Sequence, residues 1–356
     1  MNAPGSLRRA DRFLRACRRE PTEGTPIWLM RQAGRYMPEY RALRAKHGFL
    51  DMIRTPELAV EVTLQPVRAF EVDAAIVFAD ILPLLGGLGF EVAFEAGEGP
   101  RICNPLREPE RVLSRRPMEE TVGFTLDALR GAKTALAGRA PLIGFSGAPF
   151  TLACYAVEGA GSRTFSVALG FLREHPNAFH ALCERLAELT GEYLRAQVDA
   201  GADALQLFDS WAGLMTPAEF ETWVLPYARE AIRQARLGSR PVPVIYFSTR
   251  TASEEYAPLL RRTGADVIGL DSGRPLDEAW NALGDDVAVQ GNLDPEMLLR
   301  PEFELLAAAA DVLQRAGGRP GHIFNLGHGV LKETPPERVA ALVDFVHART
   351  GAEAGG

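Results

Sequence analysis

Short apolar runs alternate with longer segments of helical periodicity along most of this 356-residue chain, and this alternation constrains the fold more than any other feature. An apolar run of four to eight residues bounded by turn residues is typical of a strand buried on both faces. Such strands occur in parallel sheets covered by helices. The runs are Pro26–Met30, Ala74–Ala79, Pro141–Phe145, Ala204–Phe208, Val242–Phe247, Asp266–Leu270, Val287–Gln290 and His322–Leu326.

Most of these runs are separated by segments whose apolar residues recur at helical spacing. Pro217, Pro301 and Pro336 stand where helices would begin, a position that tolerates proline. Eight buried strands alternating with helices predict the α/β class and a single (β/α)8 barrel of the TIM type. An open doubly wound sheet is the alternative, and it is weaker because no Gly-x-Gly-x-x-Gly turn follows an early strand. The helical segments are Pro56–Phe70, Glu119–Ala137, Asn177–Val198, Pro217–Leu237, Ser253–Arg262, Pro301–Ala316 and Pro336–Ala348.

The chain shows no linker-like or low-complexity stretch, so we expect one domain over residues 1–356. The glycine- and proline-rich interval Leu85–Pro105 contains the β-like run Phe90–Phe94, which predicts a long excursion with its own hairpin. Residues 1–8 and 350–356 carry no motif and are expected to be frayed ends.

Composition excludes several classes of function. A net charge of −7 argues against nucleic-acid or acidic-membrane partners, because attraction to phosphates needs positive charge. No apolar run approaches the roughly 20 residues of a membrane helix. The four cysteines lack the spacing of metal ligands, and no secretory signal precedes them. They are typical of the reduced thiols of a cytoplasmic protein.

The first apolar run breaks abruptly into Arg31, Gln32, Ala33, Gly34 and Arg35. A planar guanidinium pairs with a carboxylate through two hydrogen bonds, and a glycine lets a ligand approach the backbone closely. These residues therefore predict either a clamp for an anionic ligand or a loop held by internal salt bridges. Spacing alone leaves both open.

A polar residue follows almost every apolar run. In a (β/α)8 barrel the carboxyl ends of all strands meet at one mouth, where the active site lies. Serine, aspartate and asparagine also cap helices, so most of these residues are expected to be structural. After the first run, they are Asp80, Ser146, Asp209, Ser210, Ser248, Asp271, Ser272, Asn292, Asp294 and His328.

Several blocks of the chain resemble, in the same order, those of the uroporphyrinogen decarboxylases. The resemblance runs from about Pro26 to Val346, and so many independent blocks in one order make it specific. The blocks are Thr25–Arg41, Phe78–Pro83, Gly144–Thr151, Tyr155–Gly159, Phe208–Gly213, Gln290–Pro295 and Asn325–Gly329.

This resemblance implies a homodimeric, cofactor-independent lyase of the heme pathway, which converts the four acetate side chains of uroporphyrinogen III to methyl groups. The products are coproporphyrinogen III and CO2. The resemblance also implies which residues bind substrate: Arg31, Gln32, Ala33, Gly34, Arg35, Asp80, Tyr155, Ser210 and His328.

The chemistry explains why these residue types would be needed. Loss of CO2 leaves electrons that a protonated pyrrole ring can accept, which removes the need for a cofactor or a metal. A carboxylate such as Asp80 near the pyrrole N–H groups would stabilise the positive charge. Asp80 could instead be only a helix cap. His328 has the pKa for proton transfer, whereas Arg31 is normally locked in its protonated form.

Two alternatives remain on the sequence. A zinc-dependent methyltransferase on the same barrel would need clustered His and Cys ligands. The chain has no His-x-Cys, and His180 and Cys183 lie in an apolar-periodic helix. A non-catalytic tetrapyrrole-binding protein would keep the arginines without the chemistry, and the presence of Asp80, Tyr155 and His328 argues against it.

Overall fold

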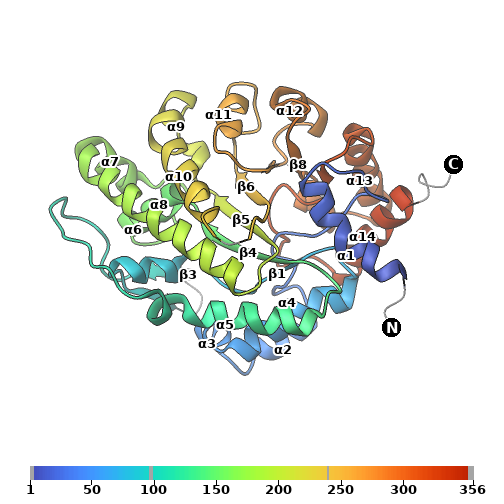
Figure 1. Ribbon diagram of the computed structural model, residues 1–356, viewed down its shortest axis with the longest axis horizontal. Helices are drawn as coiled ribbons and strands as arrows, with labels where there is room; N and C mark the ends of the chain where they lie inside the picture. Colours follow the sequence, from blue (N-terminus) through green and yellow to red (C-terminus); the bar gives the residue numbers. More distant parts are fainter. Residues whose placement is uncertain (1–3, 96–98, 239, 352–356) are drawn as a thin grey trace.

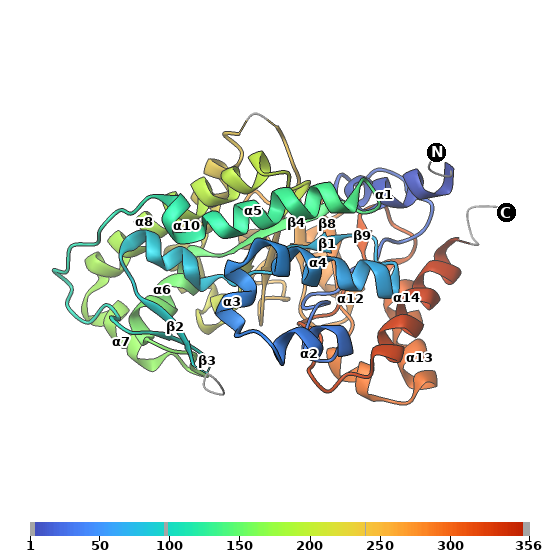
Figure 2. The same cartoon turned by 90° about the horizontal axis from the view of Figure 1, so that it is seen from below.

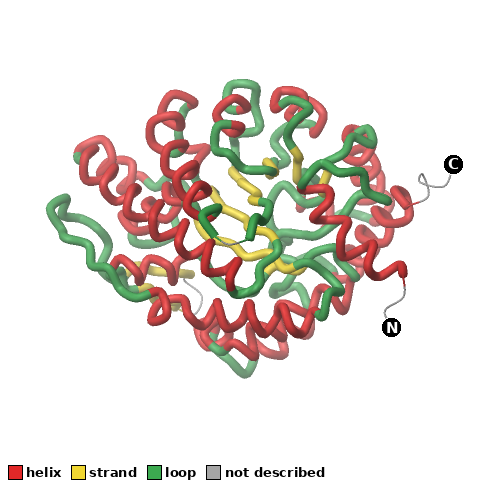
Figure 3. Tube along the Cα trace, viewed as in Figure 1, coloured by secondary structure: helices red, strands yellow, loops and turns green. Residues whose placement is uncertain are grey.

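A curved parallel sheet lies at the centre of the computed structural model, which describes residues 4–95, 99–238 and 240–351. Its seven strands follow the order β1-β4-β5-β6-β7-β8-β9, so each strand pairs with the next along the chain. Figures 1 and 3 show the strands enclosed by helices. The strands are β1 (Ala75–Ile76), β4 (Leu142–Gly147), β5 (Ala204–Asp209), β6 (Val244–Ser248), β7 (Val267–Gly269), β8 (Ala288–Gln290) and β9 (His322–Ile323).

The first predicted strand, Pro26–Met30, closes the barrel but forms only an isolated bridge to Phe324. On its other side, the Ile27 carbonyl accepts the N–H of Asp73 at 2.8 Å. The Gln32 carboxamide then joins this segment to β1, because it accepts the Leu29 N–H and donates to the Ala74 carbonyl, both at 3.1 Å. The (β/α)8 barrel is confirmed, with one junction made partly by side chains.

The predicted helices are present, with two exceptions. The segment Ser253–Arg262 is helical only over Ala257–Arg261, because Pro258 fits the first turn of a helix and not its interior. The segment Pro217–Leu237 was wrong as a single helix: it forms two, which meet at Val224. Pro226 has no N–H to continue the first helix and fits the first turn of the second. The helices are α2 (Pro38–Arg44), α3 (Phe49–Arg54), α4 (Pro56–Phe70), α5 (Met118–Leu136), α6 (Pro149–Glu158), α7 (Ser166–Glu174), α8 (Pro176–Asp199), α9 (Pro217–Trp223), α10 (Leu225–Ala235), α11 (Ala257–Arg261), α12 (Leu276–Leu283), α13 (Glu302–Ala316) and α14 (Pro336–Gly351).

Irregular elements follow several strands. The predicted hairpin is confirmed, since β2 (Val92–Glu95) pairs antiparallel with β3 (Gly99–Ile102). Three short 3-10 helices, η1 (Leu82–Leu88), η2 (Ala212–Leu214) and η3 (Pro295–Leu299), follow β1, β5 and β8. They carry the chain from the barrel mouth back to the outer helices.

The two ends of the chain are more ordered than expected. Helix α1 (Pro4–Cys17) begins within the segment expected to fray, and Phe13 is fully buried in the apolar cluster inside the barrel. At the other end, α14 continues to Gly351, and the Thr350 hydroxyl accepts the Thr25 N–H at 3.0 Å. Residues 1–3 and 352–356 lie outside the described residues. In Figure 2, α1 and α2 lie at opposite ends of the barrel.

In the part of the chain that the structure describes, no helix combines the length and the hydropathy needed to cross a bilayer.

Candidate functional site

Arg31 lies at the barrel mouth, directly after the segment that closes the barrel. Its backbone has φ 61°, a left-handed conformation that is strained for a residue with a side chain and that often marks functional sites. Gly329, in the loop after β9, makes room for the arginine, since a Cβ there would lie 2.7 Å from the Arg31 Cγ. The exposed guanidinium is thus directed by two loops of the mouth.

Asp80 lies between β1 and η1 and is partly buried. Its Oδ1 accepts the N–H of Leu82 at 2.9 Å, which supports the start of η1. Its Oδ2 has no hydrogen-bond partner among the described residues. Burial raises the pKa of Asp80 to about 6, against the smaller opposite effects of the Leu82 N–H and the Arg31 charge. One oxygen therefore acts as a cap, while the other is available to a ligand.

Tyr155 and His328 belong to the same electrostatic group as Arg31 and Asp80. Burial raises the pKa of the Tyr155 hydroxyl; the charge of Asp80 adds to this, and Arg31 opposes it. Desolvation lowers the pKa of His328, and so does the Arg31 charge. The charge of the Arg31 guanidinium thus acts on three other predicted site residues, each from a different loop or helix.

The two readings of the arginine pair differ in what they require of the protein. A loop held by internal salt bridges needs carboxylates beside Arg31 and Arg35. Within the described ranges, neither guanidinium forms an ion pair or a hydrogen bond. The charge of Arg35 acts instead on the Tyr40 hydroxyl of α2. This geometry favours the anion clamp, because a pair of exposed guanidiniums without a protein partner is suited to carboxylates.

The remaining predicted residues occupy different surroundings. Gln32 is 1% exposed, and its side chain is committed to the barrel closure. Ala33 and Gly34 are partly exposed between the two arginines. Ser210 is partly exposed after β5, and its carbonyl accepts the Thr249 hydroxyl at 2.7 Å. A role in substrate binding stays a prediction for all of them.

Sequence reasoning passed over aromatic residues at the mouth. Phe145, Phe208 and Phe247 lie one or two residues before the ends of β4, β5 and β6. Their rings pack edge to face, with neighbouring centroids 5.6 and 6.1 Å apart. The sequence held a signal for these residues: each of three successive apolar runs ends in a phenylalanine, and a polar residue follows directly. Trp211 was missed as well, and its ring lies 6.3 Å from that of Tyr155. These rings form an apolar surface near the carboxyl ends of β4, β5 and β6.

The described residues include no group of three or more His, Cys, Asp or Glu placed to hold a metal ion. His180 packs against Trp223, with ring centroids 4.0 Å apart, and Cys183 is buried in α8. The zinc ligand set of the methyltransferase alternative is therefore absent from the part of the chain described.

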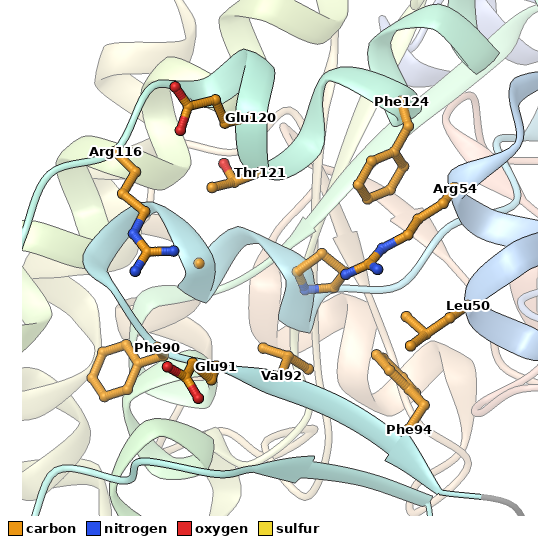
Figure 4. A pocket seen from close by; sticks show the side chains of 12 residues that line it. Leu50, Arg54, Phe90, Glu91, Val92, Phe94, Arg116, Glu120, Thr121 and Phe124 are labelled. Atoms are coloured by element: carbon orange, nitrogen blue, oxygen red, sulfur yellow. The ribbon is translucent and has the colours of Figure 1, made fainter.

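A cavity of about 630 Å³ lies beside the mouth rather than in it. Figure 4 shows Phe94 and Phe124 around it, with Arg54 and Arg116 on different sides. It is bounded by α3, η1, β2 and the start of α5, and none of the predicted site residues lines it. The candidate active site is therefore the mouth itself.

Comparison with solved structures supports the barrel fold. A methyltransferase from Methanosarcina mazei superposes with a TM-score of 0.82 at 16% identity, over 96% of this chain and 98% of that one. A B12-independent methionine synthase from Shewanella sp. W3-18-1 gives a TM-score of 0.54 at 13% identity, over 94% and 96% of the two chains. At these identities the likeness shows the fold alone.

Comparison of sequences is more specific. The family model for Uroporphyrinogen decarboxylase (URO-D) matches residues 8–349. A uroporphyrinogen decarboxylase from Chloroflexus aggregans (strain MD-66 / DSM 9485) is 57% identical over 342 residues, which is 95% of each chain. One from Roseiflexus sp. (strain RS-1) is 54% identical over 94% of this chain and 97% of its own. The chain therefore belongs to the uroporphyrinogen decarboxylase family.

Proposed function

We propose that this protein decarboxylates the four acetate side chains of uroporphyrinogen III, giving coproporphyrinogen III and CO2 in heme biosynthesis. The observation that carries the proposal is that Arg31, whose guanidinium forms no ion pair among the described residues, and Asp80, a partly buried carboxylate whose pKa the Arg31 charge lowers, both lie at the mouth of the barrel. A substrate with eight carboxylates and four pyrrole N–H groups needs both kinds of partner. The relatives at 54–57% identity that bear this activity in their names support the same conclusion.

Arg31 and Arg35 bind carboxylates of the substrate in this proposal, with Gln32, Ala33 and Gly34 between them. Neither guanidinium has to leave a protein partner in the described chain, so binding costs no internal salt bridge. Tyr155, Ser210 and His328 contact the acidic side chains from α6 and from the loops after β5 and β9. The three phenylalanines at the ends of β4, β5 and β6 lie beneath the macrocycle.

Asp80 stabilises the transition state electrostatically. Protonation of a pyrrole carbon creates a cation, into which the electrons of the breaking C–C bond flow as CO2 leaves. The free oxygen of Asp80 faces that charge, and partial burial strengthens the interaction. No metal or cofactor is needed as electron sink, because the substrate supplies its own.

His328 handles protons in this scheme. Its lowered pKa keeps the imidazole largely neutral near pH 7, so that it can bind a proton or relay one from water. Arg31 stays protonated and orients the carboxylate that is lost.

Anaerobic incubation with uroporphyrinogen III, followed by separation of products by carboxyl number, tests the activity. We expect products with seven, six, five and finally four carboxyl groups, with CO2 released in step. Binding without any loss of carboxyl groups would instead support the tetrapyrrole-binding alternative, and transfer of a methyl group would support the methyltransferase.

We also propose that residues 1–356 form one domain and that the protein is a cytoplasmic homodimer. The continuous barrel and the family resemblance support these proposals. Sedimentation equilibrium of the purified protein measures the subunit number, and calorimetry distinguishes one unfolding transition from two. Fractionation of cells tests the compartment.

A further inference from the structure

Asp209, the last residue of β5, is a fully buried carboxylate that points away from the barrel interior towards the helices. Both of its oxygens are bound. The Thr151 hydroxyl of α6 donates to Oδ1 and the Tyr246 hydroxyl of β6 donates to Oδ2, each at 2.7 Å. The carboxylate therefore joins one helix to two neighbouring strands at the level of the mouth.

The Thr151 side of this network leads directly to the candidate site. The Thr151 hydroxyl also accepts the backbone N–H of Trp211 at 3.2 Å, so it fixes the loop that carries Ser210. Four residues further along α6, on the same helix face, lies Tyr155. The Tyr155 ring packs against Trp211 and, with centroids 5.4 Å apart, against Phe165. The positions of two predicted substrate-binding residues, Ser210 and Tyr155, thus depend on the Thr151 hydroxyl.

The second hydrogen bond of Asp209, from the Tyr246 hydroxyl, does not connect to the mouth. Tyr246 is fully buried, and its ring belongs to the apolar layer between the sheet and the outer helices. Its hydroxyl donates to Asp209 and forms no other hydrogen bond among the described residues. The two hydrogen bonds of Asp209 therefore differ in role. The Thr151 hydroxyl connects the carboxylate to the mouth, whereas the Tyr246 hydroxyl binds it within the apolar layer under the outer helices.

We propose that Thr151 is a positioning residue: its hydroxyl, oriented by the Asp209 carboxylate, sets the relative placement of Ser210, Trp211 and Tyr155 at the substrate-binding mouth. The carboxylate accepts a hydrogen bond from the Thr151 hydroxyl and so orients it, which leaves the oxygen lone pairs facing the Trp211 N–H. Asp209 itself does not touch substrate. This inference rests on the proposed function for its kinetic consequence, although its structural part is independent of it.

The asymmetry supplies a matched pair of variants. Thr151→Val and Tyr246→Phe each remove one hydroxyl from the same buried carboxylate, so both are expected to lower stability by a similar amount. Only Thr151→Val also removes the acceptor of the Trp211 N–H. Thr151→Ser restores the hydroxyl and serves as the rescue. Assays are run at pH 8, well above the pKa of about 6 to which burial raises Asp209.

We expect Thr151→Val to raise KM for uroporphyrinogen about tenfold with a smaller change in kcat, and Tyr246→Phe to leave both near wild type. Amide hydrogen exchange at Trp211 should accelerate in Thr151→Val, remain unchanged in Tyr246→Phe and recover in Thr151→Ser. Equal kinetic effects in the first two variants, or unchanged exchange at Trp211, would overturn the inference. Absence of turnover in the wild type would refute the proposed function alone, since the exchange measurement would still test the positioning role.

Discussion

Replacing Asp80 by asparagine separates the chemical role of this side chain from its structural one. An asparagine Oδ1 can accept the same Leu82 N–H that Asp80 accepts at 2.9 Å, so the start of η1 keeps its hydrogen bond. The change removes only the negative charge. A cap and a catalytic carboxylate therefore predict opposite outcomes for turnover, while both predict a folded protein.

The raised pKa sets the expected effect on stability. The difference between a pKa of about 6 in the folded protein and the ordinary 3.8 corresponds to roughly 3 kcal/mol, which is the cost of burying the charged form. Because the side chain is partly exposed, solvent screens this cost, and we expect about 1–2 kcal/mol. At pH 7 the asparagine variant should be more stable than the wild type by that amount.

The dependence on pH gives the sign of the effect. Between about pH 4 and pH 6 the folded wild type retains a proton that the unfolded chain has released, so its free energy of unfolding falls as pH rises. Asparagine does not titrate. The advantage of the variant should thus be absent below about pH 4, grow up to about pH 6 and remain constant above it. Urea unfolding at several pH values measures it.

The turnover rate of the Asp80→Asn variant should fall, although its stability rises. If the Asp80 charge stabilises the pyrrole cation, kcat should fall by about two to four orders of magnitude, or roughly 3–5 kcal/mol, with a much smaller change in affinity. Asp80→Glu should be intermediate, since it keeps the charge but displaces it. A stabilised asparagine variant with near-normal kcat would refute the catalytic role.

Further predictions follow from the same geometry. Arg31→Ala and Arg35→Ala should each weaken substrate binding about ten- to a hundredfold while the protein still folds, and wild-type affinity in a folded Arg35→Ala variant would contradict the clamp. Gly329→Ala should raise KM by pushing a Cβ to 2.7 Å from the Arg31 Cγ, whereas Gly170→Ala, which meets no atom within 4 Å, should be silent in the same assay. Asp73→Ala should lower the free energy of unfolding by about 3–5 kcal/mol, because it removes a fully buried carboxylate that binds the first strand segment and a histidine of α14; a loss below 1 kcal/mol would contradict this. Exhaustive chelation should leave activity intact, and recovery that needs an added metal would refute a cofactor-independent reaction.

The clamp shows where sequence reasoning needed the structure. Spacing left Arg31 and Arg35 undecided between a ligand clamp and internal salt bridges, because a guanidinium is equally suited to either. The choice depends on where the carboxylates of distant segments lie. In the described chain no carboxylate forms an ion pair with Arg31 or Arg35, which favours the clamp without testing it. Asp80 had two readings as well. The structure shows the cap through Oδ1, whereas the catalytic role of the other oxygen stays a prediction.

Two errors in the predicted helices have different causes, one local and one tertiary. Helices α9 and α10 were predicted as one, because the apolar periodicity continues across Val224 although Pro226 breaks the hydrogen-bond ladder. Helix α1 was overlooked because its role is tertiary: Phe13 is apolar without any strong motif, and its burial becomes evident only when the barrel interior exists to receive it.

The sequence by itself determined the alternation of strands and helices, the parallel barrel and the polar residues that follow the strands, because periodicity and strand ends are properties of adjacent residues. Tertiary structure decided which of those residues interact. The Gln32 amide closes the barrel against Ala74, and Asp209 links Thr151 to Tyr246 across 95 positions of sequence. Such contacts depend on how strands register and helices pack around them, and a hydroxyl or carboxylate in the chain does not reveal which distant partner that packing will provide.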